Sequence, residues 1–327
     1  MSIQIRDKPI SPAVLLAPLA GITDLPFRNL VSSFGAGLVV SEMIASQEMV
    51  QAKPGVREKA ELGLGRDHTA VQLAGREAYW MAEAARMAED NGAQLIDINM
   101  GCPAKKVVNG YSGSALLKDL DHALTLIEAV VAAVSVPVTL KTRLGWDDQI
   151  RTAPTLAQRA ESAGIAMMTI HGRTRCQFYK GAADWTAIAE VSHAVDIPVI
   201  ANGDIISVAT ATAALSASKA AGVMIGRGAQ GRPWLLSEVA SEIEGRGQIA
   251  RPRGAVFYDI VGGHYEAMLG FYGVDLGLRV ARKHLGWYMN VAGTGAVLRR
   301  SILTAPSPAK VLALLPLAFE TDVEAAA

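Results

Sequence analysis

The sequence predicts a (β/α)8 barrel followed by a smaller all-α helical domain. From about residue 13 to 240, short apolar and β-branched runs alternate with longer amphipathic stretches, and there are eight such runs. Residues 244–254, EGRGQIARPRG, interrupt this alternation, and the pattern beyond them is helical. An open doubly wound sheet would share the periodicity, but eight units in succession favour a closed barrel. We therefore expect a barrel domain at 1–244 and a helical domain at 245–327.

The eight runs are the expected strands, since each is short, apolar and bounded by turn residues. They are AVLLAPLAG (13–21), LVVSEM (38–43), TAVQLAG (69–75), LIDINMG (95–101), PVTLKTRLG (137–145), MMTIHGRT (167–174), PVIANGD (198–204) and GVMIGRG (222–228). The stretches between them, such as 76–92 and 114–134, repeat apolar residues every three or four positions, so each predicts a helix. The first of these two should stop at Asn91-Gly92.

The region after residue 254 combines helical periodicity with positive charge. The segments 257–273, 278–290 and 308–320 are expected to be helices. Between residues 245 and 310 there are nine Lys and Arg against three Asp and Glu, although the whole chain balances 31 against 31. A local basic excess in a neutral chain indicates a surface for a polyanion. A solvated helical cap with scattered charge is the alternative interpretation.

Composition limits the class of protein. The 327 residues are half hydrophobic, and the two cysteines, Cys102 and Cys176, form neither a disulfide framework nor a C-x-x-C metal motif. We expect no metal site and a reducing, cytoplasmic setting. The N-terminus lacks the apolar core of a signal peptide, and no run is long enough to span a bilayer without Gly, Pro or charge, so no membrane association is expected.

Polar and reactive residues follow the expected strands, at the barrel end where active sites form. In chain order these residues are Glu42, Gln72, Asn99, Cys102, Lys141, Arg143, His171, Arg173, Asn202, Asp204, Gly226, Arg227 and Gly228. Any one of them could have an ordinary structural role, since a lone histidine is more often a satisfied structural residue than a catalyst. Their convergence on one rim indicates an active site.

Glycine-rich turns after the last two expected strands indicate a phosphate site. In NGD (202–204) and GRG (226–228), glycine allows backbone N–H groups to close on an anion. A flavin mononucleotide would use the rest of the rim: Lys141 can place charge near N1 and O2, and Gln72 can hydrogen-bond the ring edge. The backbone at 17–19 can lie under the ring. A phosphorylated sugar is compatible with the same residues.

Eight motifs together resemble the tRNA-dihydrouridine synthases, and the chain is most similar to the bacterial B-type branch. The resemblance runs from about residue 10 to 300 in the family's order, and its motifs are LAPLAGITDLPFR, VQLAG, DINMGCPAKKV, GSALL, KTRLGWD, HGRT, ANGDI and GRGAQGRPW. Asn-x-Gly-Cys-Pro-x-x-Lys-Val is the most specific of them. The resemblance implies an FMN barrel with a helical tRNA-binding domain that reduces the C5=C6 bond of a uridine in the tRNA D-loop. NADPH reduces the flavin, and the flavin N5 passes a hydride to C6 of the uracil.

The resemblance also implies a role for each matching residue. Cys102 would donate a proton to C5 as a movable general acid, Asn99 would hydrogen-bond the uracil, Arg143 would contact the uracil or its phosphate, and Lys106 would approach the RNA or the FMN. The FMN-binding residues would be Pro18, Leu19, Gln72, Lys141, His171, Arg173, Asn202, Gly203, Asp204, Gly226 and Arg227. The tRNA-contacting residues of the segment ARKHLGWY would be Arg279, Arg282, Lys283 and His284.

Two other classes of function share parts of this pattern. One is an FMN barrel acting on a small molecule, similar to a dihydroorotate dehydrogenase or an ene-reductase, but a basic helical domain has no use there. The other is a barrel that binds flavin or RNA without turnover, against which Cys102, Lys141 and Asn99 argue. By analogy with the B-type branch, we expect position 17 to be reduced, and the family implies NADPH as the reductant. We expect a monomer, since that suits a tRNA partner.

Overall fold

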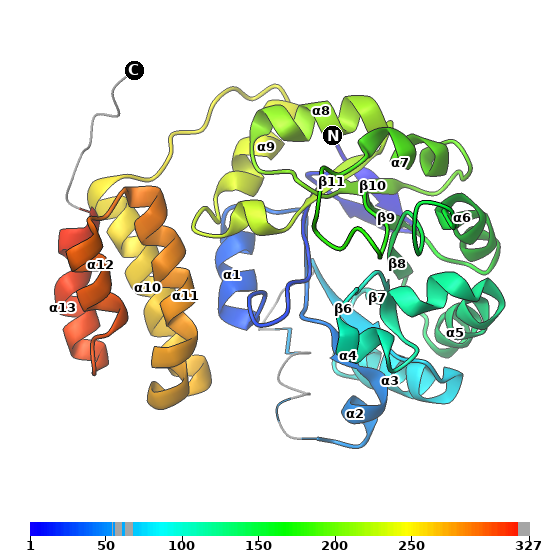
Figure 1. The fold of residues 1–327 in the computed structure, drawn as a ribbon, viewed down its shortest axis with the longest axis horizontal. Helices are drawn as coiled ribbons and strands as arrows, with labels where there is room; N and C mark the ends of the chain where they lie inside the picture. The colour runs from blue at the N-terminus through cyan, green and yellow to red at the C-terminus, as the bar shows by residue number, and fades with distance from the viewer. Residues whose placement is uncertain (54, 56–60, 63–67, 320–327) are drawn as a thin grey trace.

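A closed barrel of eight parallel strands forms the larger part of the protein (Figure 1). The computed structural model describes residues 1–53, 55, 61–62 and 68–319. The barrel strands are β3 (Val14–Leu16), β4 (Leu38–Val40), β6 (Thr69–Ala74), β7 (Ile96–Met100), β8 (Val138–Arg143), β9 (Met168–His171), β10 (Val199–Asn202) and β11 (Gly222–Ile225). Each lies within one of the eight runs identified in the sequence, so the predicted strands are confirmed.

Pairing of β4 on both sides closes the barrel. Leu15 of β3 pairs with Leu38, and Val39 and Val40 pair with the first two residues of β6. Because every barrel strand then has two parallel neighbours, the open-sheet alternative is excluded. A further strand of two residues, β5 (Ile44–Ala45), pairs with the end of β6 beyond β4 and was not expected from the sequence.

An antiparallel hairpin of β1 (Ile3–Ile5) and β2 (Lys8–Ile10) precedes the barrel. Its side chains Ile3, Ile5 and Ile10 join the buried cluster of Leu38 and Leu95 at the beginnings of the strands. The hairpin therefore covers the N-terminal end of the barrel interior. Strands of three residues are too short for an alternating pattern to predict, so this element was not expected.

Helices surround the barrel. They are α1 (Leu25–Ser33), α2 (Ser46–Val50), α3 (Ala78–Asp90), α4 (Lys105–Val108), the 3₁₀ helix η2 (Gly113–Lys118), α5 (Leu120–Ala133), α6 (Ala153–Ser162), α7 (Trp185–Ser192), α8 (Val208–Ser218), the 3₁₀ helix η3 (Arg227–Ala229) and α9 (Leu235–Ile243). Helix α3 ends at Asn91, with Gly92 at positive φ, as predicted. The single helix expected over 114–134 is wrong: Asp119 is extended, and its side chain caps α5 by accepting from the His122 amide.

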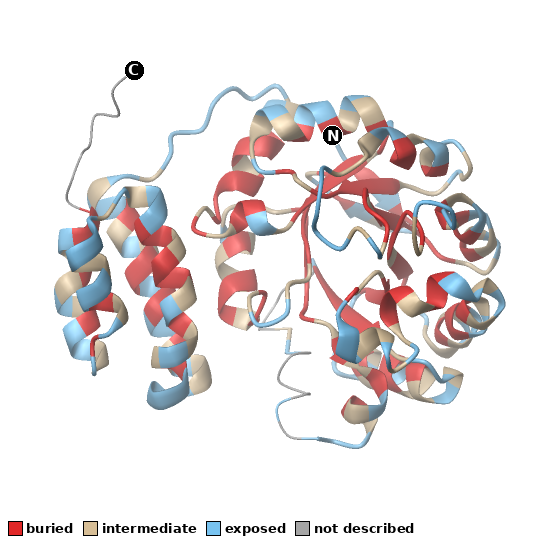
Figure 2. Ribbon diagram, in the orientation of Figure 1, coloured by how far each residue is buried: buried red, intermediate tan, exposed pale blue. Residues whose placement is uncertain are grey.

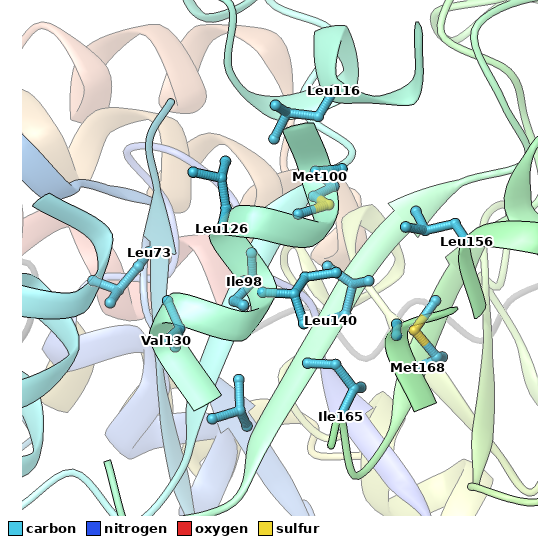
Figure 3. Packing of buried hydrophobic residues seen from close by; sticks show 14 of the residues in the cluster. Leu73, Ile98, Met100, Leu116, Leu126, Val130, Leu140, Leu156, Ile165 and Met168 are labelled. Carbon is cyan, nitrogen blue, oxygen red and sulfur yellow. The ribbon is translucent and has the colours of Figure 1, made fainter. Parts of the chain in front are cut away.

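Apolar side chains fill the space between strands and helices, as the packing in Figure 3 shows. Strand β7 illustrates the rule: Ile96, Ile98 and Met100 join this cluster. Successive residues of a strand point to opposite faces, so Asp97 and Asn99 point into the barrel. In β7 the outward face thus supplies the core between strands and helices, and the inward face carries polar groups.

Four helices form a bundle beside the barrel: α10 (Gly254–Tyr272), α11 (Val274–Ala292), α12 (Ala296–Leu303) and α13 (Pro308–Phe319) (Figure 1). The connection at 244–253 contains no helix or strand, as the sequence predicted. Figure 2 shows the buried faces of α10 and α11 as red bands. Helix α12 was not expected, while Glu320 and the rest of the expected domain up to 327 lie outside the described residues.

The bundle packs against α1 of the barrel through aromatic rings. Phe27 of α1 lies 5.7 Å from the ring centroid of His264 and 5.3 Å from that of His284. The Tyr272 hydroxyl donates to Asp24 across the same interface at 2.8 Å. These contacts join α10 and α11 directly to the chain that follows β3.

The turn before β8 generates a prediction about stability. One carboxylate oxygen of Glu89 accepts from the Ser135 amide at 2.9 Å, the Ser135 hydroxyl at 2.5 Å and the Val136 amide at 3.1 Å. The Ser135 hydroxyl lowers the pKa of Glu89, partial desolvation opposes this, and the two amides lower the pKa further. Glu89→Gln should cost about 1 kcal/mol of unfolding free energy at pH 7, measured by urea denaturation.

The pH dependence identifies the cause. A carboxylate whose pKa is lowered on folding stabilises the protein above its ordinary pKa of 4.5, and this stabilisation is lost as the pH falls. The difference between wild type and Glu89→Gln should therefore shrink below pH 4.5. Exposed Glu128→Gln is the matched control and should leave stability unchanged. A pH-independent difference would contradict this explanation.

Candidate active site

A cavity of about 650 Å³ opens at the C-terminal ends of the barrel strands. It brings together most of the residues selected from the sequence, which come from all parts of the barrel domain. Those that line it are Pro18, Leu19, Gln72, Asn99, Cys102, Lys141, Arg143, His171, Asn202, Gly203, Asp204, Gly226, Arg227 and Gly228. Arg173 and Lys106 are not among the lining residues.

Cys102 lies on the loop after β7 and is half-buried in the cavity wall. Its amide donates to Asn99 Oδ1 at 2.9 Å, and its carbonyl accepts from the Ser114 amide at 3.1 Å and hydroxyl at 2.9 Å. A Cβ at Gly113 would lie 2.8 Å from the Cys102 carbonyl oxygen, and Gly113 has a φ of +60°. Glycine is therefore required there, and the loop holds the backbone of Cys102 from both sides.

Gln72 and Asn99 are connected by their side-chain amides. Asn99 Nδ2 donates to Gln72 Oε1 at 2.8 Å, and Gln72 Nε2 donates to Asp97 Oδ2 at 2.7 Å. Asn99 Oδ1 also accepts from the Gly101 amide at 3.2 Å. Each of the two amides keeps one N–H that these bonds do not use, so each can still donate to a ligand in the cavity.

Lys141 places an amine inside the barrel. Its Nζ donates to Asn202 Oδ1 at 3.0 Å, and Asn202 Nδ2 donates to the Met224 carbonyl at 2.8 Å. Burial, together with the Arg143 charge and against the opposing charge of Asp97, lowers the pKa of Lys141 to about 8. The amine is therefore mostly charged at neutral pH but titrates close to it.

Arg143 is a second buried cation, with 2% of its surface exposed. Its Nε donates to the Gly101 carbonyl at 2.8 Å, and Nη1 donates to the carbonyls of Thr174 at 3.0 Å and Phe178 at 2.9 Å. Among the described residues, no carboxylate forms an ion pair with Lys141 or Arg143. Both cations are held by neutral oxygens, so the cavity favours an anionic ligand.

His171 ends β9 beside these cations. Burial lowers the pKa of His171 well below its ordinary value, and the charges of Lys141, Arg143 and other cations lower it further. The imidazole is therefore neutral at pH 7, and it can offer one donor and one acceptor nitrogen. It adds no charge to the cavity.

The turns after β10 and β11 form the end of the cavity that was expected to bind phosphate. Gly203 and Asp204 have φ values of +113° and +54°, so the turn is left-handed at both positions. No hydrogen bond within the described residues uses the backbone N–H groups of Gly226, Arg227 and Gly228. These three unused donors suit an anion at this turn.

Arg173 has a different position from the one expected of a cofactor ligand. Its guanidinium is 2% exposed and donates to both oxygens of Asp204, at 2.9 and 2.5 Å, and to the carbonyls of Lys180 and Gly181. Partial burial opposes ionisation of Asp204, but the hydrogen bonds from Arg173 and the Ala183 amide lower its pKa. Arg173 therefore supports the turn at Asp204 from the buried side of that turn. Its side chain is not among those that line the cavity.

Two aromatic residues at the cavity were missed by the sequence analysis. Phe178 and Tyr179 line it from the loop after β9 and are 42% and 48% exposed. The Tyr179 ring lies between the guanidinium groups of Arg143, at 5.5 Å, and Arg227, at 5.2 Å. The segment RTRCQFYKG, in which two aromatic residues lie among cations, was the signal that could have identified them.

The residues expected to contact tRNA differ in exposure. Lys106 on α4 and Arg279 and Arg282 on α11 are exposed. Lys283 instead donates to the carbonyl of Gly21, on the loop between β3 and α1 that supplies Pro18 and Leu19 to the cavity.

The structure places His284, an expected RNA contact, in the buried core and not on the exposed face of α11. Its side chain is 1% exposed, and its ring lies 5.3 Å from Phe27 and 4.9 Å from His264. Burial lowers the pKa of His284 well below its ordinary value, and the charges of His264 and Lys283 lower it further. His284 belongs to the core that joins the bundle to the barrel.

The described residues contain neither a metal-binding cluster nor a membrane-spanning helix. No group of three or more His, Cys, Asp or Glu side chains there could hold a metal ion. No helix in the described part of the chain has both the length and the apolar character to cross a membrane.

The fold and the cavity define a (β/α)8-barrel enzyme whose site combines one thiol with buried cations. A family model described as dihydrouridine synthase matches residues 15–324, so the chain belongs to the dihydrouridine synthase family. The family predicted from the motifs is thereby confirmed. Formation of dihydrouridine is a reduction, so the enzymes of this family are oxidoreductases.

Relatives extend over nearly the whole chain. A probable tRNA-dihydrouridine synthase of Rhodobacter capsulatus is 59% identical over 320 residues, covering 98% of each protein. A tRNA-dihydrouridine synthase B of Xanthomonas campestris pv. campestris is 48% identical over 311 residues, covering 95% of this chain and 94% of that protein.

Solved structures of low sequence identity share the fold. Histamine dehydrogenase from Rhizobium sp. 4-9 superposes with a TM-score of 0.56 at 12% identity, covering 81% of this chain and 50% of that one. Morphinone reductase in complex with tetrahydroNAD has a TM-score of 0.52 at 16% identity, with 76% and 90% of the two chains covered. The predicted fold class is confirmed.

The position of Lys283 generates a prediction that separates it from its neighbour. Lys283→Met removes the ammonium group that donates a hydrogen bond to the Gly21 carbonyl. Loss of this bond should cost about 1 kcal/mol, so the backbone amides of residues 19–24 should exchange with solvent about fivefold faster. Hydrogen exchange with mass spectrometry measures this without RNA. Arg282→Met removes an exposed cation one position away and should leave exchange unchanged. Equal effects of both variants would show that Lys283 does not hold the loop.

Proposed function

We propose that this protein is a tRNA-dihydrouridine synthase that uses FMN and NADPH to reduce the C5=C6 bond of a uridine in the tRNA D-loop. The observation that carries the proposal is the position of Cys102, the only thiol at the cavity among the described residues, beside the buried cations Lys141 and Arg143. Family membership and the names of the relatives support the same reaction.

The residues present fit FMN. Unused backbone donors at Gly226, Arg227 and Gly228 suit its phosphate, and Lys141 supplies positive charge where the reduced ring becomes negative. Gln72 keeps one N–H for the ring edge, and Pro18 and Leu19 line the cavity with apolar surface. His171, Asn202, Gly203 and Asp204 complete the proposed set. We propose no direct contact for Arg173, which acts through Asp204.

The chemistry requires a hydride and a proton on opposite ends of one double bond. Bound FMN supplies the hydride that adds to C6 of the uracil. Cys102 Sγ donates the proton to C5, so the two additions together convert uridine to dihydrouridine. Asn99 orients the uracil with its remaining N–H, and Arg143, which lines the cavity, contacts the base or its phosphate. NADPH is the proposed source of the reducing equivalents.

Binding of tRNA is assigned to the surface around the cavity and to the bundle. Exposed Lys106, Arg279 and Arg282 carry positive charge there. A base in a folded RNA must be turned out to reach such a cavity, and a wide positive surface supports that RNA while it binds. This surface favours tRNA over a small-molecule substrate. Position 17 is the uridine we propose, by analogy with B-type relatives, for a monomeric enzyme acting in the cytoplasm.

The reaction is tested by incubating the FMN-loaded protein with NADPH and unmodified tRNA, then measuring the RNA fragments by mass spectrometry. Wild type should add about two mass units to one D-loop uridine. Cys102→Ala should keep FMN and tRNA binding but lose on the order of 100-fold or more in rate, because it removes a proton donor and no binding group. Cys176→Ser, at an exposed loop thiol, should be fully active.

The controls decide between explanations. Full activity of Cys102→Ala, or loss of FMN from it, would contradict the role of the thiol. Absence of dihydrouridine with FMN bound and tRNA folded would favour an enzyme acting on a small molecule.

The pKa of Lys141 predicts how FMN affinity varies with pH. In the FMN-free protein the amine loses its proton as the pH rises through about 8. A bound anion favours the ammonium, so binding above that pH must take up a proton. The affinity should therefore be nearly constant below pH 8 and fall above it by up to about tenfold per pH unit. Quenching of FMN fluorescence measures the dissociation constant.

Lys141→Met provides the control for this pH dependence. The variant should bind FMN more weakly at pH 7 and lose the fall in affinity above pH 8. A decline of the same steepness in Lys141→Met would assign the titration to another group.

A further inference from the structure

We propose that Asp97 is a positioning residue that fixes the amide orientations of Gln72 and Asn99 and, through them, the backbone of Cys102. Its consequence for catalysis rests on the proposed function. The orientation of the amides does not depend on it.

Four side chains and one backbone amide form a continuous chain of hydrogen bonds inside the barrel. Thr139 Oγ1 donates to Asp97 Oδ1 at 2.6 Å, and Gln72 Nε2 donates to Asp97 Oδ2 at 2.7 Å. Asn99 Nδ2 donates to Gln72 Oε1 at 2.8 Å, and the Cys102 amide donates to Asn99 Oδ1 at 2.9 Å. The strand order explains the contact, because β6, β7 and β8 are consecutive neighbours in the barrel.

The two ends of this chain cannot change roles. A backbone N–H only donates, so Asn99 must turn its oxygen toward Cys102 and its NH₂ toward Gln72. Gln72 must then turn its oxygen toward Asn99 and its NH₂ toward Asp97. An ionised carboxylate only accepts, so Asp97 satisfies this arrangement and no other. With both ends fixed, neither amide has a choice of orientation.

Burial makes the arrangement strict. All four side chains are buried: the exposed fraction is 0% for Gln72, 2% for Asp97, 1% for Thr139 and 7% for Asn99. A buried donor without an acceptor is costly, and bulk solvent does not reach these groups to replace a missing partner. If position 97 offered no acceptor, Gln72 could satisfy its NH₂ only by turning. Asn99 would then lose its partner at Nδ2, and its side chain would be held only by the amides of Gly101 and Cys102.

Other groups inside the barrel are already committed elsewhere. Lys141 donates a hydrogen bond to Asn202, and Asn202 donates one to the Met224 carbonyl.

Burial raises the pKa of Asp97, and hydrogen bonds from Gln72 and Thr139 and the charge of Lys141 oppose this rise. A protonated Asp97 could donate to Gln72, but the fixed donor at Cys102 opposes the reversal that this would require. The chain of hydrogen bonds therefore requires Asp97 to present an accepting oxygen to Gln72.

The test uses the two cysteines of the protein. Labelling with ¹⁵N-cysteine gives two backbone amide signals, and Cys176→Ser identifies the signal of Cys102 by elimination. Hydrogen exchange at Cys102 then reports directly on its bond to Asn99. Asp97→Leu, similar in size but without an acceptor, should raise the exchange rate by about tenfold or more. Asp97→Asn keeps an acceptor and should stay within about threefold of wild type.

Two further variants serve as controls for the exchange experiment. Thr139→Val removes the other donor to the same carboxylate but leaves the acceptor for Gln72, so exchange at Cys102 should remain near the wild-type rate. Gln72→Met interrupts the chain in the middle and should reproduce the effect of Asp97→Leu, which also serves if Asp97→Leu fails to fold. Unchanged exchange in Gln72→Met and in folded Asp97→Leu, or an equal rise in Thr139→Val, would overturn the proposal.

The catalytic consequence is measured separately. In the dihydrouridine assay, Asp97→Leu should lower kcat far more than it changes KM for tRNA, and Asp97→Asn should recover most of the rate. A wild-type protein that forms no dihydrouridine would contradict the proposed function while leaving the exchange result intact. Normal exchange together with a low kcat would instead contradict the positioning role.

Discussion

A polar group inside the barrel is costly to bury without a hydrogen-bond partner, and this constraint organises most of the site. Strand β7 shows how the sequence meets it: Ile96, Ile98 and Met100 enter the core between strands and helices, while Asp97 and Asn99 point inward. Within a closed barrel these inward groups can bond only to neighbouring strands or to a ligand. Hydrogen bonds across β6, β7 and β8 therefore determine the shape of the cavity wall before any ligand binds.

The same constraint explains why the cations of the cavity remain available to a ligand. Lys141 is held by Asn202 and Arg143 by backbone carbonyls, so each has a fixed position without losing its charge to a carboxylate. Asp204 differs, because Arg173 satisfies both of its oxygens from the buried side. Arg173 thus uses its charge to support a turn, whereas the charge of Arg143 is not neutralised by a carboxylate of the described residues and is available at the cavity. Residue type alone does not distinguish these two roles.

The sequence predicted the parts of the structure that repeat. Eight strands, the connection at 244–253 and the rim residues all follow from periodicity and from the rule that barrel sites form at strand ends. The hairpin β1–β2 was not predicted because it is short. Arg173, Lys283 and His284 were assigned to ligands because they lie in recognised motifs, whereas their partners are far away in the sequence: Asp204, Gly21 and Phe27. Long-range pairing of this kind has no local signal.

These long-range contacts connect the bundle to the reaction site. The loop after β3 lines the cavity with Pro18 and Leu19. In the same loop, the Gly21 carbonyl accepts a hydrogen bond from Lys283. The loop ends at Asp24, which caps α1 and accepts a hydrogen bond from Tyr272. Helices α10 and α11 therefore contact the same short segment that forms one wall of the cavity. An RNA held by the exposed face of α11 is held relative to that wall, because no flexible element lies between Arg282 and Lys283 on one helix. Under the proposed function, the orientation of the bundle would be part of the geometry that selects which uridine reaches Cys102.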